Sequence, residues 1–567
     1  MSTDPPNNAN DLDSAAAPTP PGTSAGAALM HGHLQTEPRG FWADAWHQVL
    51  GRPGAIFGLS WIGIVAFFAV FSPLIASGHP IVMWELNEAG ERVSMSLPLL
   101  SSLSSVDLLL ILGGIIIPIW VMLPLEKTNP IPERVLKAVL ISAAFTTPPV
   151  LLLEGLTNLS LPVSVGIGAV VFLGLTVPIF LVARAEQKRS DRLIDVVYIA
   201  IFAGFIAATS ELVASMVDRP GVSDWVRAME RSDWFIPVAS LLIAASFTLI
   251  FSLVPVSRNR LNHILLILAT GAIAGSIVSQ AWQPPAPRFD YLQWEREGQI
   301  EAVYTVIPLS PYQRQLGYDL RPPGGLAVPE TTPDGEDASW PKYLLGSDGS
   351  AQDVLAQLLH ASRLSISIGL VATGIAAFIG VTLGALMGYF GGWVDLLLYR
   401  VVEIFMAVPL LFLLIVAAAV LPRNIYVMMA IIGCFTWTNA ARFTRAEFYR
   451  LRDQDFVHAA RALGLPMRSV LFRHMLPNGV TPVLVEASFA VAAAILFETI
   501  LSYLGLGPAD QASWGKLLSE AFSDVGQFIW WLAIFPGFAI FLTVLSLTLF
   551  GEAMRDAIDP KLKKAAH

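Results

Sequence analysis

The sequence is poor in the residues that hold small secreted or soluble domains together. It contains one cysteine, Cys434, among 567 residues, so no disulfide can form within the chain. Because Cys434 lies inside an apolar run, we expect it to be a small buried hydrophobic residue. Charged residues make up 14% of the chain, whereas soluble domains carry about 25%. With 54% hydrophobic residues, the chain is predicted to be a polytopic membrane protein.

The sequence also lacks the short motifs of ATP binding, of common catalytic sites and of metal sites. No GxxxxGK[ST] phosphate loop is present, because Gly515 and Lys516 are followed by Leu517. HExxH, CxxC and GxSxG are absent, and the nine histidines do not cluster at the spacing of metal ligands. We therefore expect neither an enzyme nor a bound cofactor, and ATP hydrolysis, if it drives this protein, must belong to another chain.

Long apolar runs account for most of the sequence. About 12 of them have the length needed to cross a bilayer, which predicts an all-α membrane protein. Residues 1–50 are predicted to form a disordered cytoplasmic tail and residues 551–567 a second cytoplasmic tail. Residues 51–100 should hold the first span and an outer strand-like loop, residues 101–285 about six spans, residues 286–361 an extracytoplasmic segment, and residues 362–550 five more spans. The first span and these last five are predicted over Ala55–Ser77, Ile366–Tyr389, Leu396–Val420, Ile425–Ala441, Pro482–Tyr503 and Phe528–Phe550.

A basic stretch, Asp453–Asn478, interrupts the last group of apolar runs, and we call it the island. Its charged side chains are expensive to bury in hydrocarbon, so it should lie at the cytoplasmic face. Gly464 ends a first short helix, and Pro466 stands at a favoured first position of a second. Pro477 should limit how far this second helix runs. Its apolar stripe is Met467, Val470, Leu471 and Met475, and the basic and histidine residues of the island are His458, Arg461, Arg468, Arg473 and His474.

The spacing within the island resembles the EAA signature of ABC-importer permeases. Ala459 and Ala460, then Gly464, then Leu476 and Pro477 match the two alanines, the glycine and the terminal Leu-Pro of that signature. His458 stands where a glutamate is usual. The wider text is similar to the C-type subunit of dipeptide, oligopeptide and nickel importers. By this resemblance, the residues that would couple the chain to an ATPase are Ala459, Ala460, Gly464, Pro466, Arg468, Leu471, Arg473, Leu476 and Pro477. The alternative is a juxtamembrane helix whose arginines rest on acidic lipid headgroups.

Two further segments resemble the same family. The stretch around Gly346, Asp348 and Asp353 is similar to the segment before the second core span, with Gln352 in place of the family's arginine. It predicts an amphipathic helix along the outer surface, with Ser350 and Asp353 forming a capping box. The second segment implies an outer loop near the gate and the binding protein, at Glu498, Gly505, Gly507, Ser513, Trp514 and Gly515. An interhelical hydrogen bond from Glu498 and an interfacial anchor at Trp514 are the alternatives.

The resemblance implies a permease subunit of an ATP-driven importer that works by alternating access. Its expected partners are a second permease subunit, two ATP-binding cassette ATPase subunits, an extracytoplasmic solute-binding protein and membrane lipid, with no nucleic acid. The expected location is the bacterial inner membrane, with both termini cytoplasmic. The resemblance covers the first span and the chain from about Asp290 onward, so the six runs between them are interpreted as an insertion. The alternative function is a proton-coupled secondary transporter that uses Glu211 and Glu498 as a proton relay.

Overall fold

The computed structural model describes residues 41–103, positions 107, 110, 111, 113–115, 118 and 119, and residues 290–327, 341–522 and 528–558, apart from positions 88, 316, 480, 509 and 510. Most of the six runs predicted between residues 106 and 281 therefore lie outside the described residues. The count of 12 spans stays a prediction for the same reason. The same holds for Glu211 and for the outermost part of each predicted tail.

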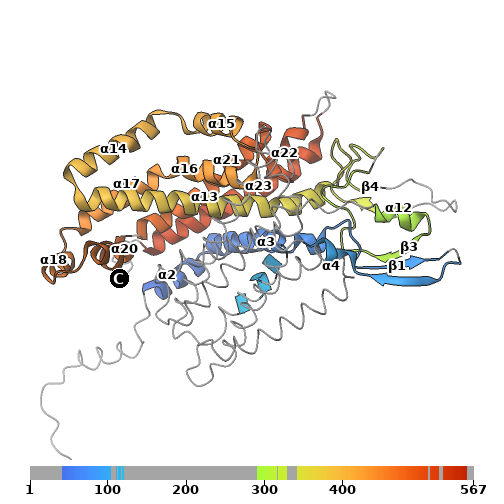
Figure 1. The fold of residues 1–567 in the computed structure, drawn as a ribbon, viewed down its shortest axis with the longest axis horizontal. Helices are drawn as coiled ribbons and strands as arrows, with labels where there is room; N and C mark the ends of the chain where they lie inside the picture. The colour runs from blue at the N-terminus through green and yellow to red at the C-terminus, as the bar shows by residue number, and fades with distance from the viewer. Residues whose placement is uncertain are drawn as a thin grey trace, which may run out of the picture.

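Four long helices form the body of the molecule: α3 (Pro53–Ile75), α13 (Val354–Phe390), α21 (Thr481–Tyr503) and α23 (Trp530–Ile558). They run along the long axis in Figure 1, and α13 packs against both α3 and α21. Each is long and apolar enough to cross a membrane, and they are the four such helices among the described residues. A helical body with several spans confirms the predicted fold class.

Helix α13 is one continuous helix of 37 residues, which corresponds to about 55 Å. A hydrocarbon core is about 30 Å thick, so α13 extends well beyond it. The sequence predicted a separate surface helix followed by a span that begins at Ile366, and this division is wrong. Asp353 caps the helix, and no proline or glycine pair interrupts the chain between the amphipathic turns and the apolar ones.

Two other predicted spans are broken in the structure. The run Leu396–Val420 forms α14 (Gly392–Ala407) and α15 (Leu410–Val420), which meet at a bend of 82°. Pro409 causes this break, because a residue before proline is driven into extended conformation, as Val408 is with ψ 132°. The run Ile425–Ala441 forms α16 (Ile425–Thr436) and the first turn of α17 (Thr438–Leu451).

Cys434 corrects another prediction. It lies on α16 and is exposed, although the sequence suggested burial. Its neighbours Ile432 and Gly433 are buried, so α16 presents one apolar side to the core and Cys434 to the surroundings. In a membrane protein the outward face is apolar as well, so an apolar run does not identify which of its residues are buried.

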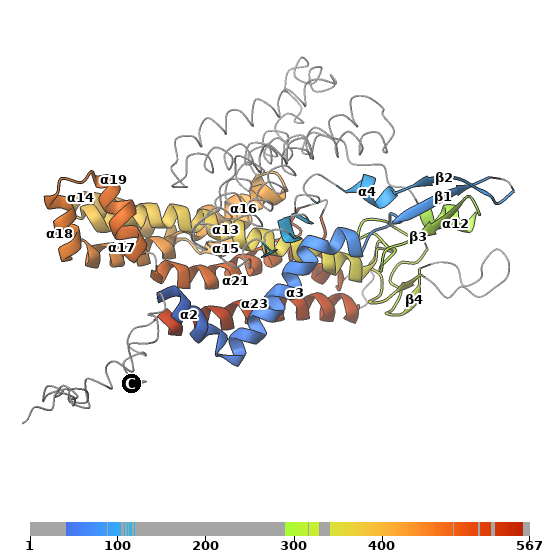
Figure 2. The same cartoon turned by 90° about the horizontal axis from the view of Figure 1, so that it is seen from below.

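A small antiparallel sheet closes one end of the molecule. Strands β1 (Val82–Leu86), β2 (Arg92–Ser96) and β3 (Ile300–Val303) follow the order β2-β1-β3, in agreement with the strand-like loop predicted after the first span. Figure 2 shows the β1–β2 hairpin projecting from this end. The strand that precedes the block of residues 101–285 and the strand that follows it therefore belong to the same sheet. The remaining elements of this end are α4 (Pro98–Ser102), α12 (Tyr291–Arg296), β4 (Gly325–Leu326) and β5 (Lys342–Tyr343).

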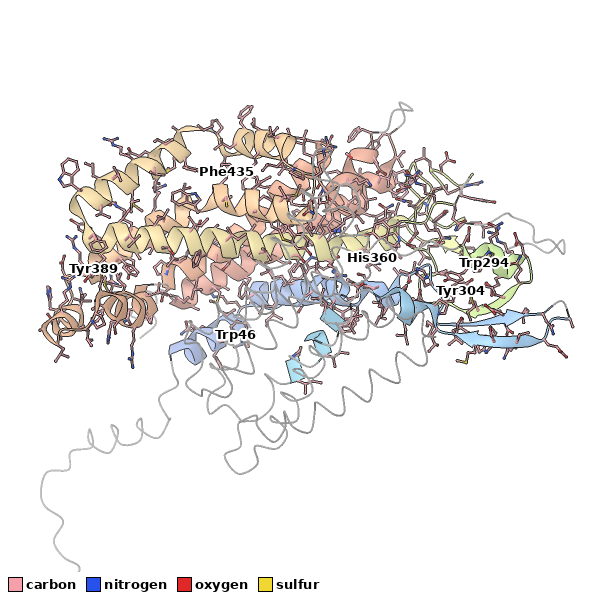
Figure 3. All side chains as sticks on the ribbon, viewed as in Figure 1. Trp46, Trp294, Tyr304, His360, Tyr389 and Phe435 are labelled. Atoms are coloured by element: carbon pink, nitrogen blue, oxygen red, sulfur yellow. The ribbon has the colours of Figure 1, made fainter. Side chains whose placement is uncertain are left out.

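The opposite end contains short helices and the ends of α3 and α23. Here α2 (Phe41–Leu50) packs Ala45 and Val49 onto Ala553 and Ala557 of α23, and Figure 3 shows Trp46 on the same helix. Residues 41–50 are thus helical, not part of a disordered tail, and α23 continues through residues 551–558 of the predicted second tail. The other elements at this end are α18 (Asp455–Ala462), α19 (Met467–Ser469), a π-helix over Val470–Met475 and α20 (Leu476–Gly479).

Candidate functional site

Gly464 forms the joint between the two helices of the island. Its φ is +71°, a left-handed conformation that glycine adopts without strain. The N–H of Gly464 donates to the carbonyl of Arg461 at 2.9 Å, and the N–H of Leu465 donates to that of Ala460 at 3.2 Å. This pair of bonds is a Schellman motif, which ends α18 and redirects the chain. The predicted stop at Gly464 is confirmed.

The second helix of the island is longer than predicted. Pro466 is the cap before Met467, and the helix then passes Pro477 and ends at Gly479. It widens into a π-helix over Val470–Met475, directly before the proline that has no N–H for the regular ladder. The sequence analysis expected Pro477 to limit this helix, but the helix continues past Pro477 to Gly479.

The apolar stripe of the second helix holds the island on the body of the molecule. Val470, Leu471 and Met475 are buried, whereas Met467, the fourth predicted member, is exposed. The three pack with the end of α17 at Phe448 and Leu451. Ala385 and Tyr389 of α13, Val457 and Ala460 of α18, and Leu465 and Leu476 complete this cluster.

The opposite side of the island is exposed and mixes apolar with basic groups. Leu463 is 80% exposed at the tip, and Phe456 and Met467 are exposed beside it. Arg461 lies over the ring of Tyr389, 4.8 Å from its centre, at the end of α13 labelled in Figure 3. Ala459, Pro466, Arg473 and Pro477 are exposed, and the side chain of Arg468 lies outside the described residues. This surface is therefore accessible and carries both apolar and basic side chains.

A row of glycines on α13 joins the body to α17. Gly380, Gly384 and Gly388 lie at i, i+4 and i+8, and a Cβ atom at Gly384 would be 2.5 Å from the carbonyl oxygen of Ala441. A Cβ atom at Gly388 would be 2.6 Å from the carbonyl oxygen of Arg445. The two backbones are therefore in contact, as in membrane helices with small residues at every fourth position. Sequence reasoning missed this row, although its spacing is visible in the sequence.

An ion pair attaches a third helix, α14, to the contact between α13 and α17. Arg445 of α17 donates from Nε to Oδ1 of Asp395 at 2.5 Å and from a terminal nitrogen to Oδ2 at 2.7 Å. Its guanidinium group also lies over the ring of Tyr399, 4.6 Å from the centre. Two parallel hydrogen bonds fix the geometry of an arginine and a carboxylate. Helix α14 is thus tied to the same turn of α17 that meets Gly388.

A cavity of about 460 Å³ opens beside the island, between α17, α21 and α23. Glu447 and Arg450 line it from α17 and form an ion pair. Glu486 and Arg555 line it from α21 and α23. The cavity thus has charges of both signs in its wall.

Glu498 organises the outer end of α21. Its side chain is fully buried, and Oε1 accepts hydrogen bonds from Ser502 at 2.7 Å and from Ser513 at 2.8 Å. Its second oxygen, Oε2, is buried without a hydrogen-bond partner among the described residues. Ser513 in turn caps α22 (Trp514–Glu520), because its Oγ accepts from the N–H of Gly515 at 3.1 Å. The carboxyl group therefore holds the start of α22 against α21.

The remaining predicted residues of this loop also fix α22 in place. Trp514 is buried, and its indole N–H donates to the carbonyl of Leu358 on α13 at 3.0 Å. A Cβ atom at Gly515 would be 2.3 Å from the carbonyl oxygen of Thr499, and one at Gly507 would be 2.3 Å from Oγ of Ser502. Gly505 has a φ of +74°. The structure thus brings all six predicted loop residues to one site, where Trp514 is a buried contact and not an interfacial anchor.

The start of α13 contains two buried carboxyl groups. Asp348 accepts from the N–H groups of Ser350 and Gln352 and from Nε2 of Gln357 at 2.6 Å. Asp353 caps α13 by accepting from the N–H of Ala356 at 2.7 Å, and burial raises the pKa of Asp353 to about 7. Asp353 is itself the N-cap of α13, and Ser350 lies before the helix, where its backbone N–H donates to Asp348, so the predicted capping box is wrong. Gly346 has a φ of +88° beside Trp531.

Metal chemistry has no support in the described part of the chain. There, no group of three or more His, Cys, Asp or Glu side chains is arranged to hold a metal ion. The side chains gathered at the island and at the outer loop make packing contacts, helix caps and hydrogen bonds.

Comparison with known families and proteins identifies the relatives of this architecture. Residues 380–564 match the family described as binding-protein-dependent transport system inner membrane component. Residues 40–87 match the N-terminal TM domain of oligopeptide transport permease C. The chain is 36% identical to the oligopeptide transport system permease protein OppC of Haemophilus influenzae, over 39% of this chain and 70% of that protein. It is 35% identical to the dipeptide transport system permease protein DppC of Alkalihalophilus pseudofirmus, over 39% and 73%.

Other similarities are more limited in extent. The chain is 38% identical to the peptidoglycan transport system permease protein YejE of Agrobacterium fabrum, over 38% of this chain, and it spans only 57% of that protein's length. A solved inward-facing structure of the MetNI methionine ABC transporter aligns with 36% of this chain and 94% of its own, at 13% identity. The TM-score of this alignment is 0.30. The family descriptions and the long apolar helices together indicate a multi-pass protein of the inner membrane.

Proposed function

We propose, from the premise that the chain belongs to the family of inner-membrane permease components of binding-protein-dependent transport systems, that it is one permease subunit of an ATP-driven importer. Its solute is a peptide or a compound related to peptides, since the names of its relatives refer to oligopeptides, dipeptides and peptidoglycan. The chain itself is the non-catalytic part, and a partner chain binds and hydrolyses ATP.

The observation that carries this proposal is the construction of the island. Its exposed tip, Leu463, stands on a Schellman joint at Gly464, and the helix behind it is packed by three buried apolar residues. An exposed apolar tip with a basic rim is suited to a pocket on another protein. We expect that pocket to belong to the ATPase, and the island to be cytoplasmic.

The contacts behind the island provide a path for its movement. The buried cluster joins the island to α17, and the glycine row joins α17 to α13 over three turns. Since packed backbones transmit displacement with little compression, a push on the tip should rotate α13 and α17 together. In the proposed cycle this movement converts an inward-facing cavity, formed with a second permease subunit, to an outward-facing one. An extracytoplasmic binding protein then delivers the solute.

Substitutions at Gly464 test the joint. A β-branched residue is strongly disfavoured at a φ of +71°, whereas asparagine tolerates it. A Cβ atom at this position would have no other atom within 4 Å, so the two substitutions differ in backbone strain and not in space. We expect Gly464→Val to lose at least 10-fold in uptake of labelled trialanine, while Gly464→Asn keeps most of it.

Purification of the protein and of the same two variants tests whether an ATPase subunit is bound to it. Tagged full-length protein, purified from its native membrane, should bring with it a chain with a phosphate-loop ATPase motif, identified by mass spectrometry. ATP hydrolysis by the complex should respond to the solute-binding protein in the Gly464→Asn variant and not in the Gly464→Val variant. Equal membrane levels of the two variants are the control. Purification without an ATPase, or normal uptake by Gly464→Val, would contradict the proposal.

A further inference from the structure

The block between β2 and β3 lies outside both family matches, which cover residues 40–87 and 380–564. The strands on either side of the block, β2 and β3, both pair with β1. The described positions between 107 and 119 are helical, and three of them contact the permease body.

Three of these positions form one face directed at the body. Asp107, Ile111 and Gly114 lie at i, i+4 and i+7, which is the spacing of a helix face. Asp107 pairs with Arg363 of α13, and Ile111 is buried. A Cβ atom at Gly114 would be 2.8 Å from Cγ1 of Val70 on α3. Leu110 and Ile115, which flank this face, are exposed, as is Ile119.

The ion pair makes this contact specific. The side chains of Arg363 and Asp107 are only 27% and 14% exposed, so both charges are largely withdrawn from solvent. Removal of either side chain takes this ion pair from a largely buried charge, which is destabilising. An apolar contact between helices could slide, whereas a paired charge and a glycine against Val70 define one position.

The partner of the block is also the part of α13 that holds the outer loop. The carbonyl of Leu358 accepts from Trp514 of α22, and Nε2 of His360 lies 2.9 Å from the carbonyl oxygen of Ala76 at the end of α3. Arg363 follows within the next turn. Figure 3 shows His360 on this half of α13, toward the sheet. Three elements thus attach to less than two turns of one helix.

We propose that the face formed by Arg363 of α13 and Val70 of α3 is the docking site of the inserted block, and that the block thereby restrains the outer loop α22. The docking follows from contacts of this chain alone. Its consequence for uptake rests on the proposed function, because the loop matters to transport only if the chain is a permease.

Cross-linking in the full-length protein tests the docking. In a Cys434→Ser background, cysteines at Val70 and Gly114, which leave the ion pair intact, should be joined by a short bifunctional thiol reagent in native membranes, because a Cβ at Gly114 would lie 3.7 Å from Cβ of Val70. Mass spectrometry identifies the linked peptides. The control pair replaces Gly114 by Leu397, an exposed residue on α14. Cross-linking of the first pair alone supports the docking, and its absence would overturn it.

Charge exchange tests the specificity of the same contact. Asp107→Asn and Arg363→Gln should each lower the thermal midpoint of the purified protein by about 3 °C, and the double exchange Asp107→Arg with Arg363→Asp should recover most of the loss. The control is Arg400→Gln, which breaks an exposed pair with Glu403 and should shift the midpoint by less than about 1 °C. Single variants indistinguishable from this control would refute the ion pair as a docking contact.

Uptake of labelled trialanine separates the two parts of the inference. If the charge variants unfold earlier and also change uptake at least 3-fold, with recovery in the exchanged pair, the restraint on the outer loop is supported. Unchanged uptake in destabilised variants would refute the restraint and leave the docking in place. Absence of uptake by the wild-type chain would instead count against the proposed function, with the cross-linking result unaffected.

Discussion

The two ends of α13 are built on different principles. At the island end apolar side chains pack around Met475, and the glycine row brings the backbones of α13 and α17 into contact, with the partly exposed ion pair of Arg445 and Asp395 at its edge. At the sheet end the buried groups include three carboxyls, Asp348, Asp353 and Glu498, each engaged in hydrogen bonds. Close-packed interiors have low compressibility and transmit strain. The carboxyls of the sheet end are only partly satisfied, because Oδ1 of Asp353 and Oε2 of Glu498 are buried without a hydrogen-bond partner among the described residues, and a partly satisfied polar network holds one arrangement less firmly than a fully satisfied one. We therefore expect the island end to move as one body and the sheet end to rearrange.

The strongest test of the island end is the introduction of a side chain into the glycine row. Gly384→Val would place a Cβ 2.5 Å from the carbonyl oxygen of Ala441 and 2.6 Å from Cβ of Thr444, so the helices must separate. Overpacking of this kind costs about 1–3 kcal/mol, and the separation interrupts the path from the island. We expect uptake of labelled trialanine to fall at least 10-fold, measured in cells with equal amounts of membrane-inserted protein.

The same helix offers a matched control for this variant. Gly374 also lies on α13, but nothing lies within 4 Å of a Cβ there. Gly374→Val has the same change in helix propensity and should keep at least half of the wild-type uptake. If the two variants behave alike, the glycine row is not part of the mechanism and the contrast between the ends is weakened.

At the sheet end the corresponding test is substitution of Glu498, the hydrogen-bond acceptor on α21. Glu498→Ala removes the group to which Ser502 and Ser513 donate and leaves two buried hydroxyls unsatisfied, each at a cost of about 1–3 kcal/mol. Glu498→Gln keeps a carbonyl acceptor in the same place. We expect uptake to fall about 5-fold in the alanine variant and to stay within 2-fold of wild type in the glutamine variant.

This pair of variants also addresses the rival transporter mechanism. A proton relay through Glu498 requires a titratable group, so glutamine would then abolish uptake as completely as alanine. An uncoupler would collapse wild-type uptake in that case, while depletion of ATP would not. Glu403→Gln, on the exposed face of α14, is the control for loss of a carboxyl group without loss of a buried acceptor.

Local sequence patterns predicted those features that depend on a few neighbouring residues. Gly464 could be recognised as a stop because a Schellman motif needs only the residues around it, and the spacing of Val470, Leu471 and Met475 identified the buried stripe. The loop around Glu498 was recognised by its resemblance to a family. Its hydrogen bonds to Ser502 and Ser513 could not be derived, because they depend on how α22 folds back on α21.

The features that sequence reasoning missed depend on contacts between distant segments. Arg445 with Asp395 and Arg363 with Asp107 join residues far apart in the chain, and hydropathy carries no information on such pairs. Burial of Cys434 was wrong because lipid-facing and core-facing positions are equally apolar. The glycine row on α13 did have a signal, since three glycines at a spacing of four within an apolar run are typical of close helix packing.

The smallest expected effect concerns pH and sharpens the contrast at the sheet end. Glu520, the last residue of α22, is largely buried, and this burial, together with the charge of Asp348, raises the pKa of Glu520 to about 7. A carboxyl group whose pKa is raised in the folded state binds more protons folded than unfolded between its two pKa values. Stability should therefore be highest below about pH 4.5 for this group and should fall as the pH rises through about 7. Asp353 acts in the same direction.

Thermal unfolding of the purified protein between pH 5 and pH 8 measures this effect. The glutamine of the Glu520→Gln variant cannot ionise. From pH 5 to pH 8 we expect the thermal midpoint of the wild type to fall by about 3 °C more than that of this variant. Part of the slope should remain in that variant because Asp353 still titrates. Glu552→Gln, at an exposed position near the end of α23, should follow the wild type. If Glu520→Gln and the wild type have parallel profiles, the carboxyl group of Glu520 does not make the sheet end sensitive to pH, and the contrast between the two ends of α13 loses this support.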